Sequence, residues 1–168
     1  MDFRLDPPGG DIGLRRDIER FPFVPANRER LYMWDAGVRM FRDHPLTGVG
    51  LQDLHAVYDR YRAPGSMERA GHLHNAFVQV AASMGAVGLA AFAWLYAALL
   101  RAAAAGLRPL LRQRGLAAGL KLGVLAAIAG FLVAGCFEWN FGDEELLYPL
   151  YLLVGLAFGA RNWEERGA

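Results

Sequence analysis

The sequence predicts an all-α integral membrane protein, in which two amphipathic helices outside the membrane precede about three transmembrane helices. The first 75 residues carry eleven Arg and eleven Asp or Glu, whereas the remainder of the 168-residue chain carries seven basic and six acidic residues. These later charges cluster between apolar runs, and residues 75–100 hold no charged side chain. We therefore divide the chain into a loop region, residues 1–74, and a membrane region, residues 75–168.

The loop region is expected to contain two amphipathic helices. Residues 1–26 are rich in Pro, Gly and alternating charges, which favours a loop. Asn27 is suited to cap a helix that ends at His44-Pro45, because a residue before proline avoids the α region. The apolar face of this helix recurs at helical spacing: Leu31, Trp34, Val38 and Phe41. A second helix, ending near Arg62, has the face Leu51, Leu54, Tyr58 and Tyr61.

Three apolar segments make up the membrane region: residues 75–100, 116–137 and 146–160. The first is long enough to span a bilayer, which requires roughly 20 helical residues. A soluble helical bundle is the competing interpretation, but three nearly charge-free runs leave no polar outer face. A transporter or channel is disfavoured, because Lys121 is the one ionisable residue within a span and it lies near an end.

The charges between the spans predict the orientation. The first connection carries only basic charges (Arg101, Arg108, Arg112 and Arg114), and the second only acidic ones (Glu138, Asp143, Glu144 and Glu145). The arginine-rich connection should be cytoplasmic, so residues 1–74 and the acidic turn should face outward. The N-terminal stretch lacks the apolar core of a signal peptide. We therefore expect this chain to be the later part of a longer membrane protein, whose upstream spans deliver the loop region outward.

Several classes of site and partner are not expected. Basic residues are balanced locally by acids, so no nucleic-acid surface is predicted. The single cysteine, Cys136, excludes an internal disulfide. His72 and His74 are two residues apart and cannot share one face of a helix, so a zinc site would need an extended segment and further ligands. His44 and His55 have no recognisable metal-binding spacing, and we predict no metal site.

Three features suggest a phosphate site at the outer surface. His74 and Asn75 lie where the first span begins, and a helix N-terminus attracts anions. Arg30 can offer a bidentate fork to a phosphate oxygen, and a nearby histidine can act as general base toward a hydroxyl. This combination suits a lipid-linked diphosphate as leaving group, with an acceptor hydroxyl attacking the sugar. The plainer alternatives are an interfacial anchor for His74 and a solvated or salt-bridging arginine for Arg30.

The order of these motifs resembles the O-antigen ligase/polymerase family of bacterial inner-membrane proteins. The motifs are Arg30 with Trp34, the "HPLTGVG" turn, His74-Asn75, and "GAVGL" within the first span. The later "FEWNFGDEELLYPLYLLVGL" is similar to the closing turn and last helix of the family. The similarity extends over nearly all of residues 27–160.

The resemblance implies a mostly helical glycosyltransferase of the cell envelope that needs no metal or cofactor. Its donor would be a glycan on undecaprenyl diphosphate at the periplasmic face. A ligase passes the glycan to a lipid A core sugar in lipopolysaccharide biosynthesis, and a polymerase passes it to another polysaccharide repeat unit. Arg30 would bind the diphosphate and His74 would help activate the acceptor. Arg28 is the alternative candidate for the diphosphate-binding arginine, and His72 is the alternative candidate for the histidine that activates the acceptor. Asn75 would contact substrate.

One departure from the family pattern affects activity. Complete members have roughly ten or more spans and a further functional arginine in an earlier outward loop. We therefore expect this chain to be the C-terminal part of such a transferase and not to catalyse transfer alone. The alternative is a non-catalytic membrane protein, either a remnant or a partner for a separately encoded N-terminal half.

Overall fold

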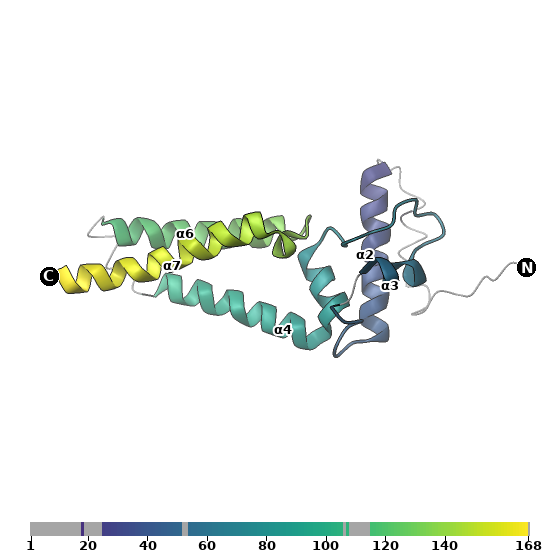
Figure 1. Ribbon diagram of the computed structural model, residues 1–168, viewed down its shortest axis with the longest axis horizontal. Helices are drawn as coiled ribbons and strands as arrows, with labels where there is room; N and C mark the ends of the chain where they lie inside the picture. Colours follow the sequence, from purple (N-terminus) through teal and green to yellow (C-terminus); the bar gives the residue numbers. More distant parts are fainter. Residues whose placement is uncertain (1–17, 19–24, 52–53, 106, 108–114, 168) are drawn as a thin grey trace, which may run out of the picture. The chain divides into compact units, whose positions relative to one another are not determined.

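A computed structural model describes residues 18, 25–51, 54–105, 107 and 115–167 of the chain. The part it describes contains α-helices and a short 3-10 helix but no strand, which confirms the all-α prediction. The helices are α2 (Pro25–Asp43), α3 (Leu54–Tyr61), α4 (Ala76–Ala104), α6 (Leu116–Ala134), η1 (Asn140–Gly142) and α7 (Glu144–Gly167) (Figure 1). They form two compact units: unit 1 comprises residues 1–91 and 136–139, and unit 2 comprises residues 92–135 and 140–168.

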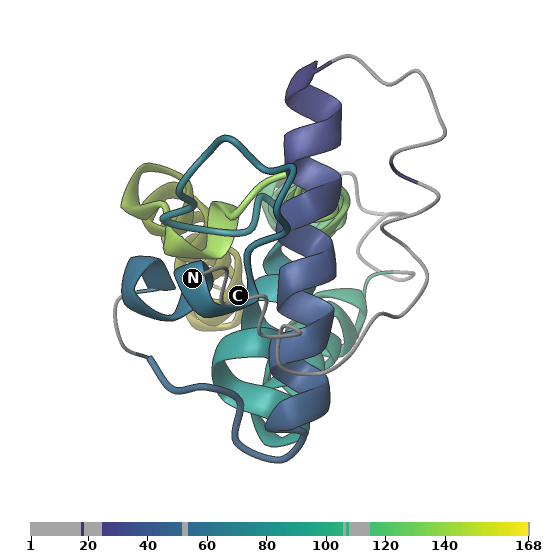
Figure 2. The same cartoon turned by 90° about the vertical axis from the view of Figure 1, so that its right-hand side faces the viewer.

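The core of unit 1 lies between α2, α3 and the first turns of α4. Its buried side chains come from all three elements and the segment before α4, and include Met33, Met40, Tyr58, Leu73 and Ala82. Gly37 allows α2 to approach α4 closely, since a Cβ built there would lie 2.5 Å from Val78 Cγ1. Figure 2 shows α2 in front of these first turns of α4.

The buried face of α2 differs from the predicted one. Val38 is exposed and Leu31, Trp34 and Phe41 are only half-buried, whereas Asp35 and Arg39 are fully buried. Asp35 Oδ2 lies 2.8 Å from Arg39 Nη2, and this guanidinium also donates to the Tyr61 carbonyl of α3. Burial of a charge is tolerated when it is paired and hydrogen-bonded. Hydrophobic periodicity alone therefore selected the wrong face.

Two predicted helix boundaries were also wrong. Helix α2 begins at Pro25, so Asn27 lies within its first turn and is not the cap. A proline at the start of a helix has a suitable fixed φ and no N–H to satisfy. Leu51 lies outside α3 and is exposed, so it does not belong to the apolar face of that helix.

A break at Gly85 interrupts α4, and the turn between α2 and α3 fills it. Gly85 has φ 64° and ψ −162°, a conformation essentially confined to glycine. The break separates backbone groups that would pair within a regular helix, and the turn pairs with them instead. The N–H groups of Val49 and Gly50 in the turn donate to the carbonyls of Ala82 and Ser83. In the other direction, the N–H groups of Ala86 and Val87 donate to the carbonyls of Pro45 and Leu46, and all four distances lie between 2.8 and 3.2 Å.

Unit 2 comprises the second part of α4 together with α6, η1 and α7. Helices α6 and α7 pack side by side (Figure 1). Tyr96 stacks on Phe131 at a ring separation of 5.6 Å, and Asn140 Nδ2 donates to the Phe131 carbonyl. Lys121 is buried, with its Nζ donating to the Ala105 carbonyl.

Within the described residues, one helix is long and apolar enough to cross a membrane, namely α4. Length and composition alone give weak support to a membrane protein. Membrane crossing by α6 and α7, the predicted limits of the three spans and the outward orientation of residues 1–74 stay predictions.

The contact between the turn and α4 predicts a specific loss of stability on substituting Gly48. A Cβ at Gly48 would lie 2.3 Å from the Ser83 backbone carbon, whereas a Cβ at Gly50 would meet nothing within 4 Å. Both glycines have positive φ, so Gly50→Ala should cost about 1–2 kcal/mol for backbone strain alone. Gly48→Ala should cost more, because backbone atoms must also move. Thermal unfolding of the two variants in detergent measures the difference, and equal losses would contradict the close approach.

Candidate functional site

Four side chains of unit 1 converge from three separate parts of the chain. Arg30 lies on α2, His72 and His74 lie in the segment between α3 and α4, and Glu138 lies in the short segment after α6. Glu138 is the common partner of the other three. We refer to His72, His74 and Glu138 as the triad.

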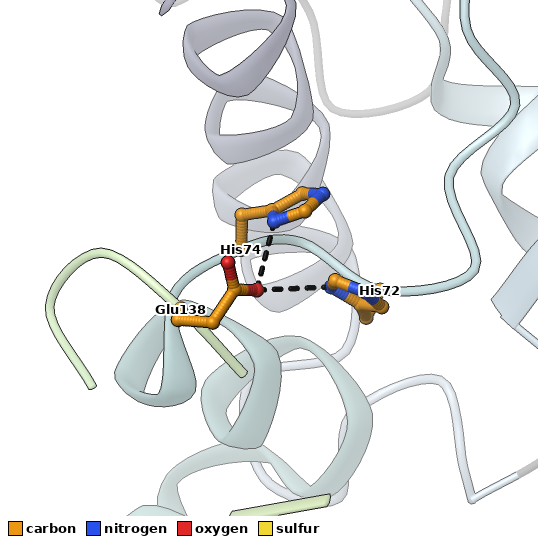
Figure 3. Close-up of side chains that lie close together, drawn as sticks. All are labelled: His72, His74 and Glu138. Carbon is orange, nitrogen blue, oxygen red and sulfur yellow. Dashed lines mark hydrogen bonds and ion pairs between the residues drawn. The ribbon is translucent and has the colours of Figure 1, made fainter. Parts of the chain in front are cut away.

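The two histidines meet the same carboxylate oxygen. His74 Nδ1 lies 2.8 Å from Glu138 Oε1 and makes a hydrogen bond, while His72 Nδ1 lies 3.7 Å from that oxygen (Figure 3). Their ring centroids are 4.2 Å apart. An ionised carboxylate accepts only, so His74 Nδ1 carries the proton and Nε2 of a neutral ring has a free lone pair. Figure 3 shows this second nitrogen on the side of the ring away from Glu138.

The backbone before α4 fixes both histidines. Leu73 lies fully buried between them, and its N–H donates to Gln79 Oε1 at 2.9 Å. His74 has φ 46°, a left-handed conformation that is uncommon outside glycine. Such a conformation persists only where the surrounding structure determines it, and strained residues of this kind cluster at functional sites.

Asn75 connects the start of α4 to the segment that carries Glu138. Its Oδ1 accepts a hydrogen bond from the Val78 N–H at 3.0 Å, which is the geometry of a helix cap. Its Nδ2 donates to the Cys136 carbonyl at 2.8 Å. The side chain predicted to contact substrate thus has two structural partners, and it already satisfies one N–H of the helix N-terminus that we expected to attract an anion.

Arg30 lies beside Glu138 with donors to spare. Its Nη2 is 3.6 Å from Glu138 Oε2, and its Nη1 donates to the Phe137 carbonyl at 3.0 Å. A guanidinium has five N–H donors, so several stay available to a ligand. Arg30 also lines a cavity of about 260 Å³ together with Asn27, Leu31, Trp34 and Phe137. The buried Trp34 Nε1 has no hydrogen-bond partner among the described residues.

Of the two alternative candidates, His72 lies in the site and Arg28 lies outside it. His72 joins the triad, as described above. Arg28 is two residues from Arg30 on α2, and a helix turns about 100° per residue, so the two side chains leave opposite sides of the helix. The structure therefore brings Arg30, His72, His74 and Asn75 to one place and leaves Arg28 away from it.

Sequence reasoning missed Glu138. We used this residue only as one of four acids that orient the chain, although the same orientation placed it on the side of the membrane that carries His74. The predicted location of both residues on the same side of the membrane was the available evidence. It could not identify a contact, because His74 and Glu138 are 64 positions apart in the sequence. The metal argument required a non-helical segment and further ligands, and in the structure the histidine segment is not helical and Glu138 offers a third ligand atom.

The surroundings of Glu138 keep it ionised. Burial raises the pKa of its carboxyl, but the hydrogen bond from the Trp139 backbone N–H and the interactions with His74 together lower it more. The pKa therefore lies below its ordinary value of 4.5. The carboxylate is charged throughout the neutral range and can both orient His74 and attract Arg30.

Comparison with known proteins gives one family match and one short match. The model of a family described as O-antigen ligase matches residues 11–93, which include Arg30, His72 and His74 but not Glu138. A stretch of 31 residues, 18% of the chain, is 71% identical to the glutamine-dependent NAD(+) synthetases of Mycobacterium tuberculosis and Mycobacterium bovis. The chain spans 5% of the length of these curated relatives. A segment of this size is shorter than an ordinary domain and carries no argument about activity.

The lowered pKa of Glu138 predicts how stability depends on pH. A group whose pKa is depressed in the folded state stabilises it above the ordinary value, and this contribution is lost as the pH falls through the depressed pKa. Wild type should therefore be more stable than Glu138→Gln at pH 6, by about 0.2–1 kcal/mol as for other exposed ion pairs. The two should converge well below pH 4.5. Thermal unfolding across this range measures the difference, with Glu145→Gln as control, and a difference that persisted at acid pH would contradict the assignment.

Proposed function

We propose that this chain, whose residues 11–93 match the O-antigen ligase family, takes part in transferring a lipid-linked glycan to an acceptor hydroxyl. The family supports lipid-linked glycan transfer and association with membranes in general terms. Our proposal goes further and assigns roles to Arg30, His74 and Glu138. It takes undecaprenyl diphosphate as the carrier at the periplasmic face of the bacterial inner membrane.

The observation that carries this proposal is the hydrogen bond between His74 Nδ1 and Glu138 Oε1. It orients the imidazole and leaves Nε2 to accept a proton. A base held by a third group is the usual arrangement for activating a hydroxyl. Glu138 acts here as a positioning residue, since it acts on the substrate through His74.

The reaction follows from this geometry. The acceptor oxygen attacks the anomeric carbon of the sugar, while its proton passes to His74 Nε2. The bond from that carbon to the diphosphate oxygen breaks, and the electron pair leaves with the diphosphate. Arg30 stabilises the developing charge through charge-assisted hydrogen bonds. No nucleotide is required, because the diphosphate is the leaving group.

The cavity beside Arg30 is suited to the donor. It combines the guanidinium with the aromatic side chains of Trp34 and Phe137. A charged fork suits the diphosphate, and an indole ring offers a flat surface to the adjoining sugar. We place the diphosphate against Arg30 and the first sugar against Trp34.

We propose ligation as the reaction, with a lipid A core sugar as acceptor, and repeat-unit polymerisation as the alternative. Both reactions use the same donor and the same base, so they differ only in the acceptor hydroxyl. Neither the cavity nor the triad favours one acceptor over the other. The lipopolysaccharide phenotype of a ligase-deficient bacterium discriminates between them, since polymerase activity would lengthen chains without joining them to the core.

The experiment is substitution of His74 in the complete gene product, expressed in a bacterium that lacks its own O-antigen ligase. His74→Ala should reduce glycan transfer by about 10²–10⁴-fold, the usual contribution of a general base. Arg30→Lys should also reduce transfer, because lysine keeps the charge but loses the planar fork. Transfer is measured by gel electrophoresis of lipopolysaccharide.

Matched variants separate catalysis from folding. His55→Ala removes an exposed histidine of α3 and should leave transfer unchanged. All variants must reach the membrane in equal amounts, as shown by immunoblotting of membrane fractions. Undiminished transfer in a correctly inserted His74→Ala variant would overturn the proposed role.

A further inference from the structure

We propose that the triad is also a binding site for a divalent transition-metal ion of the zinc class, and that the bound ion inhibits the histidine base. His72, His74 and Glu138 each offer one ligand atom, and these atoms lie within 4.8 Å of one another. The binding claim stands by itself. The inhibitory claim rests on the proposed function of His74.

The backbone before α4 makes this site possible. On a helix, residues two apart point to different sides, but here the segment is not helical and the buried Leu73 separates the two histidines. The left-handed backbone at His74, with φ 46°, belongs to this irregular segment, and the two rings lie with their centroids 4.2 Å apart. His72 and His74 therefore reach one carboxylate oxygen, at 3.7 and 2.8 Å.

Two of the three ligand separations are close to those of an occupied site, and the third, which is at most 4.8 Å, must shorten by up to about 1.3 Å. Zinc holds nitrogen and oxygen ligands at about 2.0–2.2 Å in a tetrahedron, so its ligand atoms lie roughly 3.5 Å apart. The separation of His72 Nδ1 from Glu138 Oε1 already matches this value. The contact of His74 Nδ1 with the same oxygen must open by less than about 1 Å, which a side-chain rotation can supply.

The chemistry of the three ligands favours zinc over magnesium or calcium. Two imidazole nitrogens and one carboxylate oxygen form a set that zinc binds in proteins, with water in the fourth position. Magnesium and calcium prefer oxygen ligands only. The triad side chains are 27–40% exposed, but His72 Nδ1 is itself buried, so that ring must rotate for an ion to enter from solvent.

Arg30 repels a bound cation but does not occupy the proposed metal-binding position. The guanidinium lies at Glu138 Oε2, 3.6 Å away, whereas both histidines meet Oε1. A metal ion can therefore bind at Oε1 while Arg30 stays at Oε2. The positive charge of Arg30 weakens metal binding through repulsion, so removal of the Arg30 charge should raise the affinity of the triad for the metal ion.

Metal binding would inactivate His74 by changing its tautomer. In the metal-free arrangement Nδ1 carries the proton and Nε2 accepts one. A metal ion at Nδ1 displaces that proton, so the neutral ring must carry its proton at Nε2. The nitrogen that would accept the hydroxyl proton is then blocked, although the ring itself has barely moved.

The test is zinc binding by the full chain, purified in detergent with a histidine-free affinity tag and titrated by isothermal calorimetry at pH 7.5. Wild type should bind one zinc ion per chain. Glu138→Gln and His72→Ala should each weaken binding at least tenfold, as loss of a ligand requires. His44→Ala and His55→Ala should bind like wild type, and Arg30→Ala should bind more tightly. Circular dichroism confirms that each variant keeps its helical content.

Two readouts separate the binding claim from the inhibitory claim. Binding that is equally strong in wild type, Glu138→Gln and His72→Ala would overturn the site, as would the absence of binding to wild type. In the transfer assay of the complete gene product, zinc should inhibit and a chelator should restore activity. Zinc that binds at the triad without slowing transfer would leave the site intact and overturn the role of His74 as base.

Discussion

The structure of unit 1 depends on the exchange of backbone hydrogen bonds between the turn after α2 and the broken helix α4. A helix broken at Gly85 leaves two carbonyls and two N–H groups without their helical partners, and buried backbone groups of this kind are costly to leave unpaired. The turn supplies all four partners. Because this turn directly follows α2, the exchange fixes that helix against the first turns of α4. Arg30 on α2 and His74 just before α4 are held in one unit as a result.

This exchange gives a physical account of two glycine-containing motifs that look unrelated in sequence. "HPLTGVG" forms the turn after α2, and "GAVGL" lies at the break in α4 with which this turn exchanges backbone hydrogen bonds. Gly48 is needed because Ser83 is too close for a side chain, and Gly85 because Leu46 is. Each glycine is thus explained by the closeness of the partner segment as well as by its own positive φ.

The sequence predicted the helical class better than it predicted burial or contact. Spacing located the helices but selected the wrong face of α2, because a mutually neutralising pair, Asp35 and Arg39, is invisible to hydrophobic periodicity. Arg30 and His74 could be proposed from motif order and residue chemistry. Glu138 could not, since its position depends on a segment that follows α6 and returns to unit 1. Contacts between distant segments are determined by tertiary packing, which local patterns do not encode.

In the proposed reaction and the proposed metal site, the two oxygens of Glu138 have separate roles. Oε1 accepts from the Trp139 N–H and from His74, and Oε2 faces Arg30. A phosphate that draws Arg30 away would compete at Oε2 and leave the hydrogen bond to His74 in place, so the base would stay oriented while the donor binds. A metal ion competes at Oε1 and at His74 Nδ1, and so acts on the base itself. Glu138 can thus take part in both events, because a phosphate donor bound by Arg30 and a metal ion bound by the triad approach different oxygens of its carboxylate.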